Sequence, residues 1–312
     1  MRILFIFIDG VGIGKNDPLK NPCALPGIRL FNHFCAEKFP KRLLYGGVIK
    51  PIDAQLGTAG FPQSATGQTA IFTGKNVARI LGKHLSGFPN NKLRELLTQY
   101  SILHRITQLG KKAGFINAYR PIFFDQGPEK LIRFLSVTSI MNWKAGLKFF
   151  DFDDLHRGCC IYHDFSNQEL IKKGFNVREF SPERAAQILT SASREFDFLL
   201  YEYFKTDYAG HSQNMAYAVD LLGRLEAFLL NVIQRIDLDE TLFIITSDHG
   251  NIEDLTLKSH TLNPVPLMVW GKGNTEFVKQ VDSVLDITPT ILKFLSSGEF
   301  SESESVKIVG TS

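Results

Sequence analysis

Three short apolar runs in this chain each lead to an acidic residue, and this pattern limits the possible folds more than any other feature. The runs are residues 3–8, 198–204 and 242–246, and the polar residues that follow them are Asp9, Asp207, Asp248 and His249. Apolar runs of this length, rich in β-branched and aromatic residues, are typical of buried strands. The carboxyl ends of parallel strands line one edge of a sheet, so we expect these polar side chains to gather at that edge.

Helical patterns separate the strand-like runs. One helix is expected to begin with Ser181 as its N-cap and Pro182 at its first position, because serine caps and an initial proline both suit a helix start. Residues 217–236 predict an amphipathic helix, and Thr288 is expected to cap a last helix with Pro289 at its first position. Alternating strands and helices predict an α/β domain with a mainly parallel central sheet and helices on both faces.

The rhythm of strands and helices also predicts the domain organisation. Residues 1–124 and 181–298 are expected to form the core, which a chain of 312 residues is long enough to bury. Residues 125–180 are aromatic-rich and irregular, which indicates a small lid or decoration. Residues 299–312 belong to a tail rich in serine and glutamate.

The composition excludes several classes of partner. The apolar fraction of 44% and the charged fraction of 21% are those of an ordinary globular protein. A formal net charge of +3 without a basic run gives no reason to expect nucleic acid as a partner. The apolar run at the amino terminus is short and has no small-residue cleavage site, so we expect neither a signal peptide nor a membrane span. The four cysteines form no CxxC pair, and we expect a reduced, cytoplasmic protein.

Histidines accompany the acidic residues at the predicted sheet edge. Asp207 and His211 stand four apart in "DYAGH", a spacing that places both on one face of a helical turn. His260 lies in "SHTLNPVP", and His249 follows Asp248 directly. Taken singly, an Asp-Gly pair is usually a turn and a loop histidine is usually solvated. Gathered at one edge, three carboxylates and three imidazoles instead suit two divalent ions, Mn²⁺ or Zn²⁺ rather than Mg²⁺, which prefers oxygen ligands.

A serine stands where a loop leads into a predicted short helix. This residue is Ser64, within "GFPQSATGQTAIFTG" at residues 60–74. Ser64 is either a simple N-cap or a nucleophile. The second alternative is chemically reasonable because a helix amino terminus favours phosphate and a nearby metal could hold the hydroxyl as an alkoxide.

The ordered motifs "DG", "QSATGQ", "DYAGH", "SDHGN" and "HTLNPVP" resemble those of the alkaline phosphatase superfamily. The chain is most similar to the branch that contains cofactor-independent phosphoglycerate mutase and phosphopentomutase, and the resemblance runs from residue 3 to about residue 295. It implies one metal site with the ligands Asp207, His211 and His260. It implies a second metal site with the ligands Asp9, Asp248 and His249, towards which Ser64 bridges as the nucleophile.

Two departures from that branch shape the functional expectation. The mutases carry histidine where this chain has Gln68, and their substrate-handling insertion is a sizeable second domain. A mutase must retain its intermediate during reorientation, which a small lid makes harder. We therefore expect first a hydrolase in which Ser64 attacks a small cytoplasmic phosphomonoester and water cleaves the phosphoserine. A phosphomutase is the close alternative, and a catalytically silent metal-binding module is a further one. A sulfatase is disfavoured because Ser64 lacks the x-Pro-x-Arg sequence after it.

One arginine is a candidate for binding the substrate. Arg120 ends a predicted strand and would point to the same edge, where a guanidinium can hold phosphate through two hydrogen bonds. An ordinary surface arginine in the loop before Pro121 is the equally plausible alternative. The expected partner is a small phosphorylated metabolite.

Overall fold

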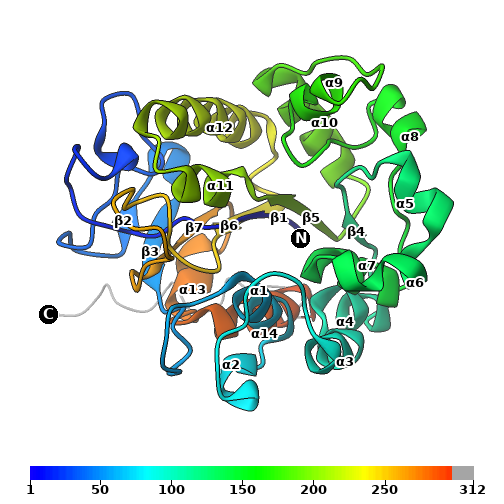
Figure 1. Ribbon diagram of the computed structural model, residues 1–312, viewed down its shortest axis with the longest axis horizontal. Coiled ribbons are helices and arrows are strands. Elements are labelled where there is room, and N and C mark those ends of the chain that lie inside the picture. Colours follow the sequence, from blue (N-terminus) through cyan, green and yellow to red (C-terminus); the bar gives the residue numbers. More distant parts are fainter. Residues whose placement is uncertain (297–312) are drawn as a thin grey trace, which may run out of the picture.

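The computed structural model describes residues 1–296, which form a seven-stranded sheet with helices on both sides (Figure 1). The sheet order is β2-β3-β7-β6-β1-β5-β4. The strands are β1 (Arg2–Ile8), β2 (Lys41–Arg42), β3 (Val48–Ile52), β4 (Ala113–Phe115), β5 (Phe198–Tyr203), β6 (Thr241–Thr246) and β7 (Val265–Trp270). Strands β4, β5, β1 and β6 are parallel, whereas β7 is antiparallel to both β6 and β3. The mainly parallel α/β core expected from the sequence is confirmed.

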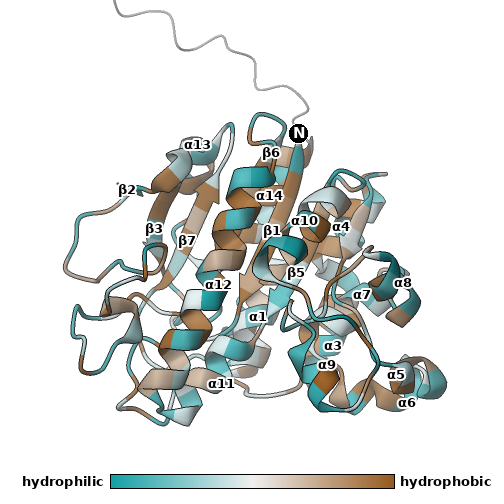
Figure 2. Ribbon diagram, turned by 90° about the horizontal axis from the view of Figure 1, so that it is seen from above, coloured by the Kyte–Doolittle hydropathy of each residue, from teal (hydrophilic) through white to brown (hydrophobic). Residues whose placement is uncertain are grey.

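Strand β1 lies at the centre of the fold and is buried on both faces. Its side chains alternate between two hydrophobic cores: Phe5 and Phe7 join one, and Leu4 and Ile6 join the other. Such alternation follows from the two-residue period of a strand. Figure 2 shows hydrophobic colouring along β1 and β7, together with mixed faces on the helices that cover them. A continuous apolar run is therefore what a central parallel strand requires.

Two groups of helices cover the sheet. One face carries α10 (Pro182–Ser193) and α12 (Met215–Arg235). The other face carries α1 (Ser64–Thr73), α2 (Val77–Leu81), α3 (Asn91–Tyr100), α4 (Ile102–Gln108), α7 (Val137–Lys144), α13 (Asn274–Lys279) and α14 (Ile287–Ser296). Each group buries an apolar stripe against the sheet, so the fold has two cores separated by one layer of strands.

Of the two predicted helix caps, one is confirmed and one is wrong. Ser181 caps α10 as expected, because its side chain accepts a hydrogen bond from the Arg184 amide. Helix α14 begins at Ile287, so the prediction that Thr288 caps this helix was wrong. A 3₁₀ turn at Val284–Asp286 leads directly into α14, and Thr288 lies inside the helix, where its Oγ1 donates to the Ile71 carbonyl over 2.6 Å.

The long connection between β4 and β5 holds the segment that the sequence suggested as a lid. Besides α7 and α10, it contains α5 (Pro121–Gln126), α6 (Pro128–Leu131), a 3₁₀ turn at Ile132–Phe134, α8 (Phe152–Arg157) and α9 (Gln168–Lys172). Helix α7 contributes Ile140 and Met141 to the sheet core, and Phe165 stacks on Phe228 of α12 with ring centroids 4.6 Å apart. Residues 125–180 are thus anchored in both cores rather than attached at one point.

The predicted tail at residues 299–312 lies outside the described residues. Within residues 1–296, no helix has both the length and the apolar character that crossing a membrane requires.

Candidate metal centre

The predicted ligands lie together at the carboxyl edge of the parallel strands. Asp9 follows β1, Asp207 and His211 lie on α11 (Lys205–Ser212) just after β5, and the remaining ligands follow β6. They form two groups, and within each group one ligand atom per residue lies within 4.8 Å of the others. The groups are Asp9, Asp248 and His249, termed the buried triad, and Asp207, His211 and His260, termed the outer triad.

The buried triad surrounds a point beside the predicted nucleophile. The Nε2 atom of His249 lies 3.3 Å from Asp9 Oδ1 and 3.5 Å from Asp248 Oδ2. The Oγ atom of Ser64 lies 3.0 Å from the same Nε2. Asp9 Oδ1 and Asp248 Oδ2 are buried and accept no hydrogen bond. Buried carboxylate oxygens are normally satisfied, so these two atoms suit a bound cation.

The histidines of the outer triad also present atoms that suit a bound cation. His260 Nδ1 lies 2.7 Å from the Pro62 carbonyl, and His211 Nδ1 lies 3.1 Å from the Lys258 carbonyl. Because a carbonyl only accepts, both Nδ1 atoms carry hydrogen and both Nε2 atoms present lone pairs. These Nε2 atoms are 3.3 Å apart, and His260 Nε2 is 3.5 Å from Asp207 Oδ1. Lone pairs that face each other beside a carboxylate make a site for a divalent ion.

The pKa shifts of the residues in the two triads also favour bound cations. Burial, reinforced by the charges of Asp248 and Asp207, raises the pKa of Asp9 well above its ordinary value. Burial and the charge of Asp207 likewise raise the pKa of Asp248. Burial lowers the pKa of His249 and of His260, so both imidazoles are held neutral. Ionised carboxylates beside neutral imidazoles need positive charge from elsewhere, and a pair of divalent ions supplies it. The residues present therefore fit the predicted metals.

Ser64 occupies the first position of α1 and is not its N-cap. Gln63 is the N-cap and makes no side-chain capping bond, which leaves the Ser64 hydroxyl directed at His249. The rings of His249 and His260 stack with centroids 3.7 Å apart, so the two triads are in contact. The carbonyl of Pro62, two residues before Ser64, holds His260 in place. The nucleophile loop and both triads therefore form one connected unit.

Three polar residues that support the ligands were not predicted as site residues. Asn251 Nδ2 donates to Asp207 Oδ1 over 2.7 Å, and Gln68 Nε2 donates to Asp9 Oδ2 over 3.1 Å. Glu253 accepts hydrogen bonds from the amides of Gly12 and Asn251. Such partners orient ligating carboxylates. Asn251 follows "SDHG" directly, and the presence of Gln68 in place of the mutases' histidine was the signal available in the sequence.

Close backbone approach explains the glycines of the motifs. Gly10 has a positive φ of 73°, and a Cβ atom there would lie 2.8 Å from the Cα of Asp207. A Cβ atom at Gly67 would lie 2.9 Å from the carbonyl oxygen of Asp248. Side chains at these positions would push apart the segments that carry the ligands.

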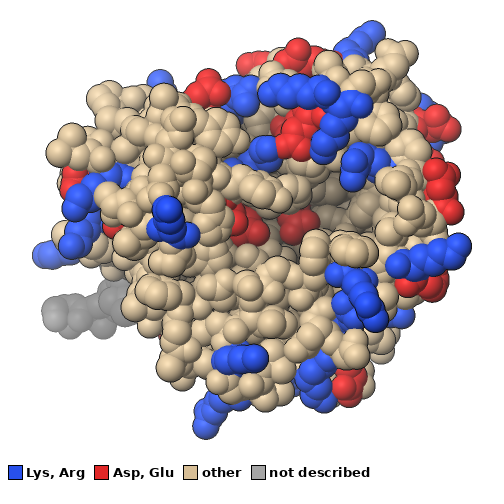
Figure 3. All heavy atoms as spheres, viewed as in Figure 1, with Lys and Arg blue, Asp and Glu red and all other residues tan. Residues whose placement is uncertain are grey.

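A cavity of about 850 Å³ opens beside the buried triad and is visible as a hollow in Figure 3. Asp9, Ser64 and Asp207 lie in its wall, and exposed Arg120 lines the same cavity from the start of α5. Glu202 on β5 also lines it; burial raises the pKa of this carboxyl to about 7, although a 2.7 Å hydrogen bond from Thr138 Oγ1 opposes the shift. The cavity therefore joins the ligand edge of the sheet to the β4–β5 connection.

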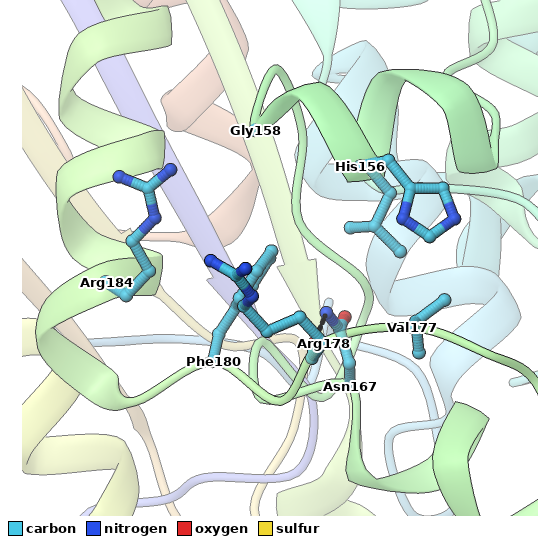
Figure 4. Close-up of a pocket in the computed structure, with 8 residues that line it drawn as sticks. His156, Gly158, Asn167, Val177, Arg178, Phe180 and Arg184 are labelled. Carbon is cyan, nitrogen blue, oxygen red and sulfur yellow. Dashed lines mark hydrogen bonds between the residues drawn. The ribbon is translucent and has the colours of Figure 1, made fainter.

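A smaller pocket of about 170 Å³ lies on the other side of that connection, between α8 and α10. Figure 4 shows Arg178, His156 and Arg184 around it. The pocket contains none of the ligand residues, whereas the larger cavity is lined by Asp9, Ser64 and Asp207.

Part of the chain is similar to a family of known proteins. The model of the Metalloenzyme superfamily matches residues 164–298, a segment that includes the whole outer triad. The 2,3-bisphosphoglycerate-independent phosphoglycerate mutase 1 of Methanocaldococcus jannaschii is 32% identical over 88 residues, 28% of this chain and 21% of that protein. The corresponding mutase of Antithamnion sp. is 30% identical over 148 residues, 42% of this chain and 28% of that protein. The aligned segments thus span less than a third of these relatives.

Solved structures resemble the chain over almost its whole length. The PH0037 protein from Pyrococcus horikoshii has a TM-score of 0.57 at 14% identity, with 96% of this chain and 98% of that chain covered. Alkaline phosphatase from the Antarctic bacterium TAB5 has a TM-score of 0.53 at 14% identity, with coverage of 96% and 99%. The chain thus matches the Metalloenzyme superfamily over residues 164–298 and shares its overall fold with alkaline phosphatase. Segments of it are similar in sequence to 2,3-bisphosphoglycerate-independent phosphoglycerate mutases.

Proposed function

We propose that this protein transfers the phosphoryl group of a phosphomonoester through a phosphoserine at Ser64, with two divalent ions in the two triads. The observation that carries the proposal is the position of the Ser64 hydroxyl, 3.0 Å from His249 Nε2 and at the wall of the large cavity. A silent metal-binding module would not require a hydroxyl at that point. When bound, the ions would neutralise phosphate oxygens and favour the ionised hydroxyl.

Different residues would position the phosphate and stabilise its charge. Ser64 stands at the amino end of α1, whose positive dipole end favours an approaching phosphate. His211 and His260 are fixed in one tautomer by backbone carbonyls, so the outer triad is organised before substrate arrives. Arg120 would neutralise a further oxygen of the phosphate from the cavity wall.

The acceptor of the phosphoryl group separates a hydrolase from a mutase. The sequence led us to expect a hydrolase first, whereas the relatives that align are phosphoglycerate mutases. They support the alternative better, and we therefore favour transfer to a second hydroxyl of the substrate. The α7 helix, anchored in the sheet core, and the helices around it would enclose the intermediate during its reorientation.

The proposal is tested with metal-loaded protein in water enriched in ¹⁸O and a substrate that carries two hydroxyl positions. A mutase returns isomerised phosphomonoester without ¹⁸O in the phosphate, and a hydrolase releases phosphate that contains ¹⁸O. Ser64→Ala should lower turnover by at least about 1000-fold, because its loss removes the covalent step. Equal turnover by Ser64→Ala and native protein would exclude Ser64 as the nucleophile.

A further inference from the structure

The large cavity suggests which kind of alcohol the substrate carries, an inference that rests on the proposed function. Its volume of about 850 Å³ lies within the range of pockets that hold ligands the size of drugs and nucleotides. A three-carbon phosphoester would leave most of this space unfilled. The wall beyond Ser64 is also largely aromatic and aliphatic, which a small polyhydroxylated substrate does not need.

One part of the wall is a row of aromatic rings in contact. Tyr162 and His163 have ring centroids 4.0 Å apart, and His163 stacks on Phe204 at 4.3 Å. Phe204 in turn contacts Tyr208 at 5.8 Å, and all four residues line the cavity. The row begins in the β4–β5 connection and ends on α11, next to Asp207. The rings are inclined to one another by 45°, 28° and 64°, so the row offers both faces and edges to an aromatic ligand.

A second part of the wall consists of aromatic side chains that the protein leaves exposed. Phe88, between α2 and α3, is 50% exposed, and Phe134, in the 3₁₀ turn after α6, is 68% exposed. Their rings meet at 6.3 Å with an interplanar angle of 85°. Ile122 of α5 lies in the same cavity and is also exposed. Single exposed apolar residues are ordinary, but a group of them around one cavity marks a ligand surface.

Polar groups border the aromatic surfaces. Lys205 donates to Glu169, and Lys173 Nζ lies 3.7 Å from the same carboxylate. Both lysines and Glu169 line the cavity. A ligand that fills the space would therefore meet apolar faces together with charged donors and an acceptor at their edge.

We propose that the substrate is a phosphomonoester whose alcohol carries a flat heteroaromatic ring, as a nucleoside monophosphate does. A heteroaromatic ring combines apolar faces with a polar edge, which matches the two aromatic surfaces and their polar border. Phe88 and Phe134 are the residues that determine this specificity, and neither touches the ligand triads. The phosphate would lie at Ser64 and the ring between these surfaces.

The experiment compares two ligands that differ only in the base, adenosine 5′-monophosphate and ribose 5-phosphate. Calorimetry with Mn²⁺-loaded Ser64→Ala protein measures binding without turnover. We expect the nucleotide to bind at least about 10-fold more tightly. Phe88→Ala and Phe134→Ala, added to that background, should remove most of the difference, and Phe134→Tyr should retain it. Tyr100→Ala, at an exposed aromatic residue that does not line the cavity, is the matched control.

The outcomes separate this inference from the proposed function. Equal dissociation constants for the two ligands, or no measurable nucleotide binding, would overturn the inference. Native protein that turns over ribose 5-phosphate as well as the nucleotide would preserve phosphoryl transfer but remove the specificity. A base-dependent difference in binding without turnover of either compound would keep the aromatic site and count against the proposed function.

Discussion

The two adjacent triads each contain three potential ligands, two carboxylates and one imidazole in the buried triad and one carboxylate and two imidazoles in the outer triad, and they also differ in contact with solvent. Asp248 and His249 of the buried triad are fully buried, whereas the His211 side chain of the outer triad is 41% exposed. In the outer triad, His211 and His260 donate to the backbone carbonyls of Lys258 and Pro62, and Asp207 accepts a hydrogen bond from Asn251. From this difference we expect the buried triad to depend more strongly on a bound cation, because solvent does not reach its charges.

Removal of both metals should have the largest effect. Dialysis against a chelator should abolish phosphoryl transfer, and Mn²⁺ or Zn²⁺ should restore it, because within residues 1–296 the carboxylates of the buried triad pair only with His249. Turnover measured before and after metal addition checks this prediction, with bound metal counted by elemental analysis. Full activity at less than one metal per chain would contradict a two-metal centre.

Matched substitutions in the two triads should separate their roles. Asp248→Asn and Asp207→Asn should each reduce the bound metal from two ions to one and lower turnover by at least about 100-fold. Without metal, Asp248→Asn should increase the free energy of unfolding by roughly 1–3 kcal/mol. The substitution removes a carboxyl group whose ionised form is unfavourable in the protein interior.

Asp207→Asn should leave the metal-free stability nearly unchanged, because the native Asp207 side chain is 19% exposed and solvent already stabilises its charge. Chemical denaturation of the metal-free proteins measures both values. Equal stability changes for the two variants would show that burial does not distinguish the triads.

The supporting amides give a finer version of the same comparison. Asn251→Ala removes the hydrogen bond to Asp207, and Gln68→Ala removes the hydrogen bond to Asp9. Each should weaken one metal site by about 10- to 100-fold and leave the other within a few-fold. Competition with a metal-binding dye resolves the two affinities, and weakening of both sites by either substitution would indicate that the triads load as one unit.

The smallest expected effect is on stability, from substitution of Glu202. This residue adds negative charge beside the buried triad. Its pKa of about 7 in the folded protein exceeds its ordinary value of 4.5, so the unfolded chain releases this proton first as the pH rises. Stability from this group is therefore intact below pH 4.5 and is lost as the pH rises through 7. Glu202→Gln should stabilise the metal-free protein by about 1–3 kcal/mol at pH 8 and have little effect at pH 4.5.

Thermal unfolding of the metal-free native and variant proteins across this pH range tests the prediction for Glu202. Thr138→Val, which removes the hydroxyl that donates to the carboxylate, is the control and should destabilise at pH 8. A pH-independent difference between native protein and Glu202→Gln would rule out the raised pKa.

Local patterns made the central sheet and the gathering of the ligands predictable. A buried parallel strand must be apolar on both faces, and polar residues at its carboxyl end must lie at one edge, so Asp9 and Asp248 were visible in the sequence. Ser64 was recognised through its position at a helix start. The pairing of the ligands into two sites followed from the resemblance to a family and not from the pattern itself.

Other features depend on contacts between distant segments, which no local pattern contains. The prediction that Thr288 caps a helix failed because a preceding 3₁₀ turn already starts the helix. Asn251 and Gln68 act through side chains that meet ligands 44 and 59 positions away in the sequence. The aromatic surfaces of the cavity combine Phe88 with Phe134 and Tyr162 with Phe204, so their shared wall appears only after folding.

The long connection between β4 and β5 supplies most of the cavity wall but no ligand to either triad. Selection can therefore rework residues 121–180 for a new alcohol while the reactive centre stays intact, as long as α7 keeps its place beneath the sheet. Exchange of this connection between relatives is accordingly a direct route to enzymes with altered substrate range and unchanged chemistry.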